Sequence, residues 1–264
     1  MTPPPPPGPV PSCRLRQVLA EGRLAVGTMI VEARQTSVIT LLKHAGMDFV
    51  LLDGEHGPFS IETIADLSRA ARDAGITPIV RPPEHSYAWL TQPLDAGAQG
   101  IMLPRVTDRA QVEAAVACMK YPPLGRRGTV LARGHTDFLA GPLLPTLEAM
   151  NRETFLMIQV ETRQAVDGLD DILTVPGVDA ALVGPTDLSV SLGVGGQLEH
   201  PTLVSAIERT LAACARHGVI PAIHTNEVAL TAAWARRGMR IVSIASEAGL
   251  LLQSARAAVA VIRA

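Results

Sequence analysis

Residues 48–81 of the chain read DFVLLDGEHGPFSIETIADLSRAARDAGITPIVR. Two short apolar runs, at 48–53 and 77–81, flank a stretch at 61–74 in which apolar residues recur at helical spacing. Gly75 follows that stretch, and glycine readily adopts the left-handed conformation that ends a helix. The segment therefore predicts a strand, a helix and a second strand in succession.

The same alternation continues from about residue 24 to the C-terminus. We expect eight strands, at 25–31, 48–53, 77–81, 100–103, 155–160, 179–184, 219–224 and 240–245, and helices that include 61–74, 109–119, 201–217 and 228–237. Nearly continuous apolar strands, each followed by a helix, bury both faces in a parallel sheet, and eight of them close into a (β/α)8 TIM barrel. The alternative is a doubly wound open sheet, but its usual nucleotide signatures, GxGxxG and GxxxxGK, are missing.

The length of 264 residues suits one barrel domain at 24–264. Residues 2–11 hold seven prolines, so we expect 1–23 to be a disordered proline-rich tail and a lead-in. The longest interval between predicted strands, 104–154, contains YPPLGRRG at 121–128. A loop of this length is a candidate lid or subunit contact.

Composition excludes several classes of partner. A net charge of −2 and an aromatic content of 3% do not suit nucleic-acid binding. No apolar run approaches the roughly 18 residues that span a bilayer, and prolines occupy the place of a signal-peptide core. Cys13, Cys118 and Cys214 are too few and too far apart for a disulfide framework. These features predict a cytoplasmic protein.

Polar side chains gather where four predicted strands end, and in a barrel those carboxyl ends form the active-site mouth. The strands end in LLDGEHGP, IVRPP, IQVETR and LVGPTDLS, which bring together Asp53, Glu55, His56, Arg81, Gln159, Glu161 and Asp187.

Glu161 and Asp187 follow adjacent strands, and two carboxylates held close without a cation repel each other. A divalent metal resolves this conflict, and two carboxylates that leave positions for water and substrate suit Mg²⁺ or Mn²⁺. Gln159 is on the same strand face as Glu161 and could orient a metal water or the substrate. The alternative is that Asp187 caps a helix.

Asp53 and His56 lie three residues apart across a turn, a spacing that lets the carboxylate accept the imidazole N–H. We interpret the pair as an acid/base dyad; the alternative is an ordinary loop histidine. Glu55 receives no role.

Arg81 precedes Pro82 and Pro83, which would hold its guanidinium over the mouth to bind an oxyanion. The alternative is a structural ion pair with Asp53 or Glu161. We assign substrate contacts to Arg81, Gln159 and Thr186.

Lys43 and Lys120 are the chain's two lysines, and both end predicted helices on the side opposite the mouth. A Schiff-base mechanism needs a lysine in the pocket. Carbonyl chemistry here would therefore depend on a metal. His224 ends a predicted strand and could face the mouth, but it receives no role.

Seven strings in order resemble the HpcH/HpaI aldolase family, over about residue 24 to the C-terminus. They are LLDGEHGPFSIETI, PIVRPP, DAGAQGIMLPRV, YPPLGRRG, IQVETRQAV, GVDAALVGPTDLSVSLG and SEAGLLL. The resemblance implies a metal-dependent class II pyruvate aldolase on a (β/α)8 barrel, assembled as a hexamer that is built from dimers, and these dimers exchange the last helix.

By the same resemblance, Glu161 and Asp187 are the metal ligands, His56 with Asp53 is the base dyad, Arg81 binds the oxo acid and Gln159 lines the site. The chain departs from the family after the seventh strand, where AIHTNEVAL at 222–230 replaces a more apolar strand end. That departure concerns the pocket for the acceptor aldehyde.

The predicted reaction is the reversible cleavage of a 4-hydroxy-2-oxo acid to pyruvate and an aldehyde, through an enolate held on Mg²⁺, Mn²⁺ or Co²⁺. His56 would take the proton of the C4 hydroxyl, and Arg81 would donate to the enolate oxygen. The alternatives are an oxaloacetate decarboxylase, a citrate lyase β-like CoA lyase and a binding protein without catalysis.

Overall fold

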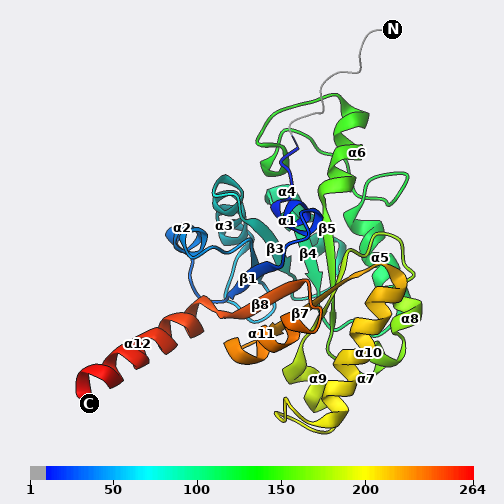
Figure 1. Cartoon of the computed structure of the whole chain (residues 1–264). Coiled ribbons are helices and arrows are strands. Elements are labelled where there is room, and N and C mark those ends of the chain that lie inside the picture. The colour runs from blue at the N-terminus through cyan, green and yellow to red at the C-terminus, as the bar shows by residue number, and fades with distance from the viewer. Residues whose placement is uncertain (1–9) are drawn as a thin grey trace.

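The computed structural model describes residues 10–264, which form a closed barrel of eight parallel strands surrounded by helices (Figure 1). Each strand pairs with the next in the chain, and β8 pairs with β1 to close the barrel. The strands are β1 (Ala25–Ile30), β2 (Phe49–Asp53), β3 (Thr77–Arg81), β4 (Gly100–Leu103), β5 (Phe155–Val160), β6 (Ala180–Val183), β7 (Ile220–Thr225) and β8 (Ile241–Ser246). The predicted (β/α)8 barrel is confirmed.

The helices are α1 (Arg14–Ala20), α2 (Ser37–His44), α3 (Ile61–Asp73), α4 (Tyr87–Ala96), α5 (Arg109–Met119), α6 (Leu143–Glu153), α7 (Arg163–Asp167), α8 (Leu169–Ile172), α9 (Pro185–Ser191), α10 (Pro201–His217), α11 (Val228–Arg236) and α12 (Glu247–Arg263), with a 3-10 turn, η1, at Gly134–Thr136. Each predicted strand end lies within one residue of the observed one. Gly75, Gly218 and Gly238 have φ values of 72°, 67° and 114°, as their positions after helices predict.

The alternation of side chains along β5 shows how the barrel positions its polar groups. Phe155 and Met157 pack inside the barrel, whereas Leu156, Ile158 and Val160 pack against the surrounding helices. Because side chains alternate between faces, Gln159 continues the inward row. The same period brings Asp53, Arg81 and His224 inward at the ends of β2, β3 and β7.

Helix α1 closes the opposite, amino-terminal end of the barrel. Cys13, Leu15 and Val18 are fully buried in the interior cluster with Phe49 and Phe155. The lead-in expected before residue 24 thus contains a helix that is part of the core. Residues 1–9 of the predicted tail lie outside the described residues.

The long segment between β4 and β5 packs at this same end, beside α4. Arg127 pairs with Asp95, and the N–H of Gly128 donates to the Tyr87 hydroxyl at 2.7 Å. Of the two roles expected for this loop, a lid or a subunit contact, these contacts with α4 do not support the lid, and the subunit contact stays a prediction.

Helix α12 leaves the barrel and projects from its side (Figure 1). Its base is fixed by Glu247, whose carboxylate accepts the N–H groups of Val31, Glu32 and Ala33 at 2.7–2.9 Å. None of its residues is buried, and Val261 and Ile262 are 79% and 82% exposed. Within residues 10–264, no helix is both long and apolar enough to cross a membrane.

Candidate active site

A cavity of about 230 Å³ opens at the carboxyl ends of the strands. Side chains from most of the strands and their following loops contribute to its wall. They are Met29, His56, Arg81, Met102, Gln159, Leu182, Gly184, Pro185, Thr186, Asp187, His224 and Asn226. Arg81, Gln159, Thr186, Asp187 and His56 therefore meet at one cavity, while Asp53, Glu55 and Glu161 contact these residues from behind the wall.

Glu161 is held by two donors at the edge of this cavity. One carboxylate oxygen accepts the backbone N–H of Arg105 at 2.6 Å, and the other accepts the side-chain amide of Gln159. A Cβ at Gly184 would lie 3.2 Å from Gln159 Nε2 and 3.5 Å from Glu161 Oε2, so the missing side chain lets β6 approach the pair closely. Burial raises the pKa of Glu161 to about 7, and the charges of Asp187 and Glu55 add to that rise.

Asp187 lies in the first turn of α9, whose N-cap is Gly184 and whose first turn begins with Pro185. The alternative in which Asp187 caps this helix is therefore wrong. Its carboxylate is instead part of the cavity wall beside Thr186.

Arg81 and Asp53 form a buried two-point ion pair. Arg81 Nε donates to Asp53 Oδ1 at 2.9 Å, and Nη2 donates to Oδ2 at 2.6 Å. Burial alone would raise the pKa of Asp53, but the hydrogen bonds and charge of Arg81 outweigh it and hold that pKa below its usual value. The structural pair foreseen as an alternative for Arg81 is present, and the guanidinium still lines the cavity.

Glu55, which received no role from the sequence, links the two arginines of the mouth. Its carboxylate lies 3.4 Å from Arg81 Nη1 and 3.1 Å from Arg105 Nε, and its side chain is 10% exposed. Arg105 has a positive φ of 50°, which is uncommon for a residue other than glycine. In that conformation, its backbone N–H reaches Glu161. Sequence spacing gave no signal for Arg105.

The expected dyad between Asp53 and His56 is not the arrangement observed. Asp53 accepts the backbone N–H groups of Glu55 and His56, at 3.0 and 3.2 Å, and its remaining capacity is taken by Arg81. The imidazole Nε2 lies 4.0 Å from Glu55 Oε2, and the His56 side chain is 73% exposed at the rim. The turn satisfies Asp53 through the backbone of His56, which leaves Glu55 as the carboxylate beside the ring.

Residues 28–254 match the model of the HpcH/HpaI aldolase/citrate lyase family. The chain belongs to this family. It is 34% identical over 250 residues to a hydroxypyruvate/pyruvate aldolase of Roseobacter denitrificans, an alignment that covers 94% of this chain and 96% of the relative. It is 32% identical over 244 residues to a 4-hydroxy-2-oxo-heptane-1,7-dioate aldolase of Salmonella dublin, covering 92% and 91%.

The crystal structure of an HpcH/HpaI aldolase from Desulfitobacterium hafniense is similar throughout. The TM-score is 0.91 at 32% identity, and the match covers 96% of this chain and 97% of the other. Within the family, these relatives support an aldolase, a carbon–carbon lyase, as the activity of the chain.

The donor set of this HpcH/HpaI barrel fits a hard divalent cation. Glu161 and Asp187 offer carboxylate oxygens, and Gln159 Oε1 is buried without a hydrogen-bond partner in the described structure. Among residues 10–264, no group of three or more His, Cys, Asp or Glu side chains surrounds a common point. Two carboxylates would leave positions on a cation for water and substrate.

Both lysines lie away from this site, as predicted. Lys120 is buried, and its Nζ donates to the backbone oxygens of Asn151 and Thr154 at the amino-terminal end of β5. Lys43 ends α2, and its Nζ lies 3.4 Å from the Cβ position of Gly75.

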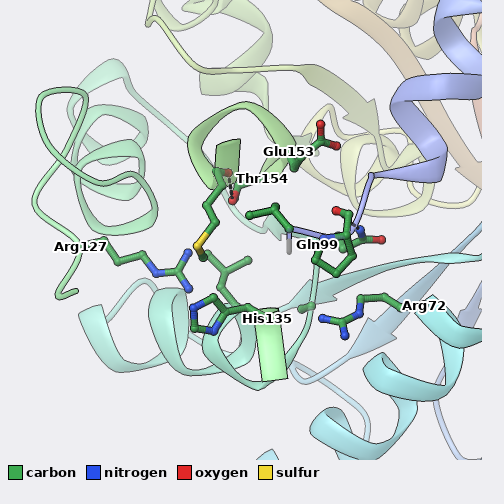
Figure 2. Close-up of a pocket in the computed structure, with 11 residues that line it drawn as sticks. Arg72, Gln99, Arg127, His135, Glu153 and Thr154 are labelled. Atoms are coloured by element: carbon green, nitrogen blue, oxygen red, sulfur yellow. Dashed lines mark hydrogen bonds between the residues drawn. The ribbon is translucent and has the colours of Figure 1, made fainter. Parts of the chain in front are cut away.

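A second cavity lies at that amino-terminal end (Figure 2). Arg72 and Arg127 approach it from two sides, with His135 between them. Its volume of about 30 Å³ is enough for a water molecule. Each arginine is already paired with a carboxylate, Asp137 for Arg72 and Asp95 for Arg127, so the walls carry little uncompensated charge.

Proposed function

We propose that the protein is a divalent-metal-dependent aldolase that reversibly cleaves a 4-hydroxy-2-oxo acid to pyruvate and an aldehyde. One observation carries the proposal: the guanidinium of Arg81 and the oxygens of Gln159 and Asp187 line one cavity, with the carboxylate of Glu161 against it. This set provides a donor for an oxo acid and an all-oxygen metal site. The aldolase names of the relatives support the reaction class.

Glu161 and Asp187 would hold Mg²⁺, Mn²⁺ or Co²⁺. A bound cation would supply Lewis-acid polarisation of the oxo group and so favour breakage of the C3–C4 bond. Gln159 donates its amide to Glu161, which fixes the carboxylate and leaves the buried Oε1 without a hydrogen-bond partner in the described structure.

Arg81 would bind the oxo acid and donate to the oxygen on which negative charge develops. Such a donor is effective when it is fixed before the reaction, because no energy is then spent on reorientation. The two hydrogen bonds to Asp53 supply this fixation. Glu55, 3.4 Å from the remaining Nη1, balances the charge of the guanidinium.

His56 would accept the proton of the C4 hydroxyl during cleavage and return it in the synthetic direction. Its exposed ring at the rim can turn toward the substrate. Glu55 is the carboxylate placed to stabilise the imidazolium, a role that the spacing in the sequence suggested for Asp53.

The exchange of pyruvate methyl protons for deuterium tests the proposal without the natural aldehyde. With Mn²⁺ or Mg²⁺ in D₂O, the protein should accelerate exchange well above the free-metal rate, as measured by NMR. His56→Ala should slow the exchange if the imidazole moves that proton. If the metal-loaded protein exchanges no faster than the free metal, then pyruvate is not the nucleophile.

The family resemblance further implies a hexamer built from dimers that exchange the last helix, and we infer that α12 is the exchanged element. An apolar groove of about 420 Å³ lies at its base, lined mainly by α2 and α12 residues such as Val38, Leu41 and Leu251. A helix of 17 residues with no buried side chain needs a partner surface to be stable.

A further inference from the structure

His224 is a polar group of the cavity that the proposed reaction does not use. It lies near the end of β7, two residues after Ala222 and on the same face of the strand, and Ala222 packs inside the barrel. Asn226, two residues further, also lines the cavity. His224 on the strand and Asn226 in the bend that follows it form one polar strip of the cavity lining.

The ring of His224 is held by the neighbouring strand. Its Nδ1 lies 2.9 Å from the hydroxyl oxygen of Ser243, the residue directly opposite it in the β7–β8 register. Ser243 is fully buried, so this contact is shielded from water. Within residues 10–264, Nε2 of the ring has no hydrogen-bond partner, which leaves it available to a molecule in the cavity.

The imidazole is a neutral group at this position. Burial lowers its pKa to about 4, and the positive charge of Arg81 contributes to the decrease. A neutral ring with one fixed nitrogen can donate to or accept from a hydroxyl group, but it does not attract a carboxylate as a cation would.

The other groups around the cavity favour the same kind of ligand. Among the lining residues, Arg81 carries the positive charge, and this charge is already balanced by Asp53 and Glu55. Met29, Met102 and Leu182 supply apolar parts of the wall. Since Arg81 and the carboxylate side serve the oxo acid in the proposed function, the polar strip on β7 remains for the second reactant.

We propose that His224, oriented by Ser243, hydrogen-bonds a hydroxyl group on the acceptor aldehyde, so that the enzyme selects small uncharged hydroxyaldehydes. This inference rests on the proposed aldolase function. Asn226 at the rim offers a further hydrogen-bond donor and acceptor to a second hydroxyl group of the same aldehyde.

The experiment compares pairs of aldehydes that differ by one hydroxyl: glycolaldehyde with acetaldehyde, and glyceraldehyde with propanal. Aldol formation from saturating pyruvate and Mn²⁺ would be measured as kcat/KM by mass spectrometry. His224→Leu should lower the hydroxyaldehyde-to-aldehyde ratio of kcat/KM by about tenfold, which is the effect of losing one hydrogen bond at a site built for it. Partial misfolding cancels because each ratio is taken within one variant, and intrinsic aldehyde reactivity cancels when the ratio of the variant is divided by that of the wild type.

Two further variants separate hydrogen bonding from shape. His224→Gln retains a polar group and should keep more of the preference than His224→Leu. Ser243→Ala leaves the ring without its support and should reduce the ratio by a smaller factor, about threefold. The carboxylate-bearing aldehyde 4-oxobutanoate should react less well than glyceraldehyde with the wild type.

An unchanged ratio in His224→Leu would overturn the inference. So would a preference that follows the donor, hydroxypyruvate over pyruvate, with no preference among acceptors. Neither result would affect the proposed aldolase function, which is tested by deuterium exchange of pyruvate in the wild type alone.

Discussion

Arg81 and Asp53 are paired across the β2–β3 ladder at the same register position, and their side chains form two hydrogen bonds at 2.9 and 2.6 Å. Both are buried, with Arg81 8% and Asp53 1% exposed. The pairing fixes the plane of the guanidinium before any ligand enters. Asp53 is thus a positioning residue for Arg81, a role different from that of a partner to His56.

Arg81→Lys should lower kcat by about 10² to 10³, as expected for the loss of a fixed oxyanion donor. An ammonium group cannot make two parallel bonds to Asp53 and also present a planar donor to the oxo acid. Steady-state kinetics would show the loss, with circular dichroism to confirm the fold. Activity within a few-fold of the wild type would make Arg81 a structural residue only.

Glu161→Ala should abolish divalent-cation binding and turnover, because Asp187 alone cannot hold a weakly bound hard cation. Isothermal titration of the EDTA-treated protein with Mn²⁺ measures this directly. Glu113→Ala, which removes an exposed carboxylate paired with Arg109, is the matched control and should bind the cation normally. Equal Mn²⁺ affinity in both variants would remove Glu161 from the ligand set.

The free energy of unfolding should increase as the pH rises above about 8, because of the buried side chain of Lys120. Burial lowers the pKa of Lys120 to about 8, whereas in the unfolded chain it is near 10.5. Between these values the unfolded chain binds more protons, so the free energy of unfolding increases with pH. Urea denaturation at pH 7.5 to 10 should show the wild type gaining about 1–3 kcal/mol relative to Lys120→Met. A difference independent of pH would contradict a buried ammonium.

Charged residues at the apolar end of α12 should dissociate the proposed assembly. The double change Val261→Asp and Ile262→Asp places two charges where a partner surface is expected, so a dimer or larger species should become smaller. Light scattering after size exclusion gives the mass. Gln253→Asp, an exposed polar position on the same helix, is the control. If the wild type is itself a monomer, α12 is not an exchanged element.

The fold could be predicted from the sequence because its signals are local. Each strand is a short apolar run, and glycines such as Gly75 and Gly218 mark where helices end. Helix α1 could not be predicted, because Leu15 and Val18 are buried only through their packing against the end of the barrel, which lies far away in sequence. The position of the segment 121–128 could not be predicted, because the residues that it contacts, Asp95 and Tyr87, are distant in sequence.

The residues of the site could be predicted, but their partners could not. Strand alternation was enough to bring Arg81 and Gln159 to one cavity, and the place of Asp187 just after the end of β6 was enough to bring it to the same cavity. The spacing of Asp53 and His56 permitted a side-chain contact, yet the turn used the backbone of His56 instead. Arg105 could not be predicted from the sequence. It contributes a backbone N–H, and the left-handed conformation that directs this group to Glu161 is not indicated by an arginine side chain.

The helix that closes the amino-terminal end of the barrel also has a kinetic consequence. Among residues 10–264, α1 and the interior side chains fill one end of the barrel, so we expect molecules to enter and leave through the cavity at the other end. Arg81 and Gln159 are nearly inaccessible, whereas His56 and Asn226 stand at the rim. In a pocket with a single opening, the ligand that binds deepest must enter first and leave last. Pyruvate should therefore bind before the aldehyde in synthesis and depart after it in cleavage.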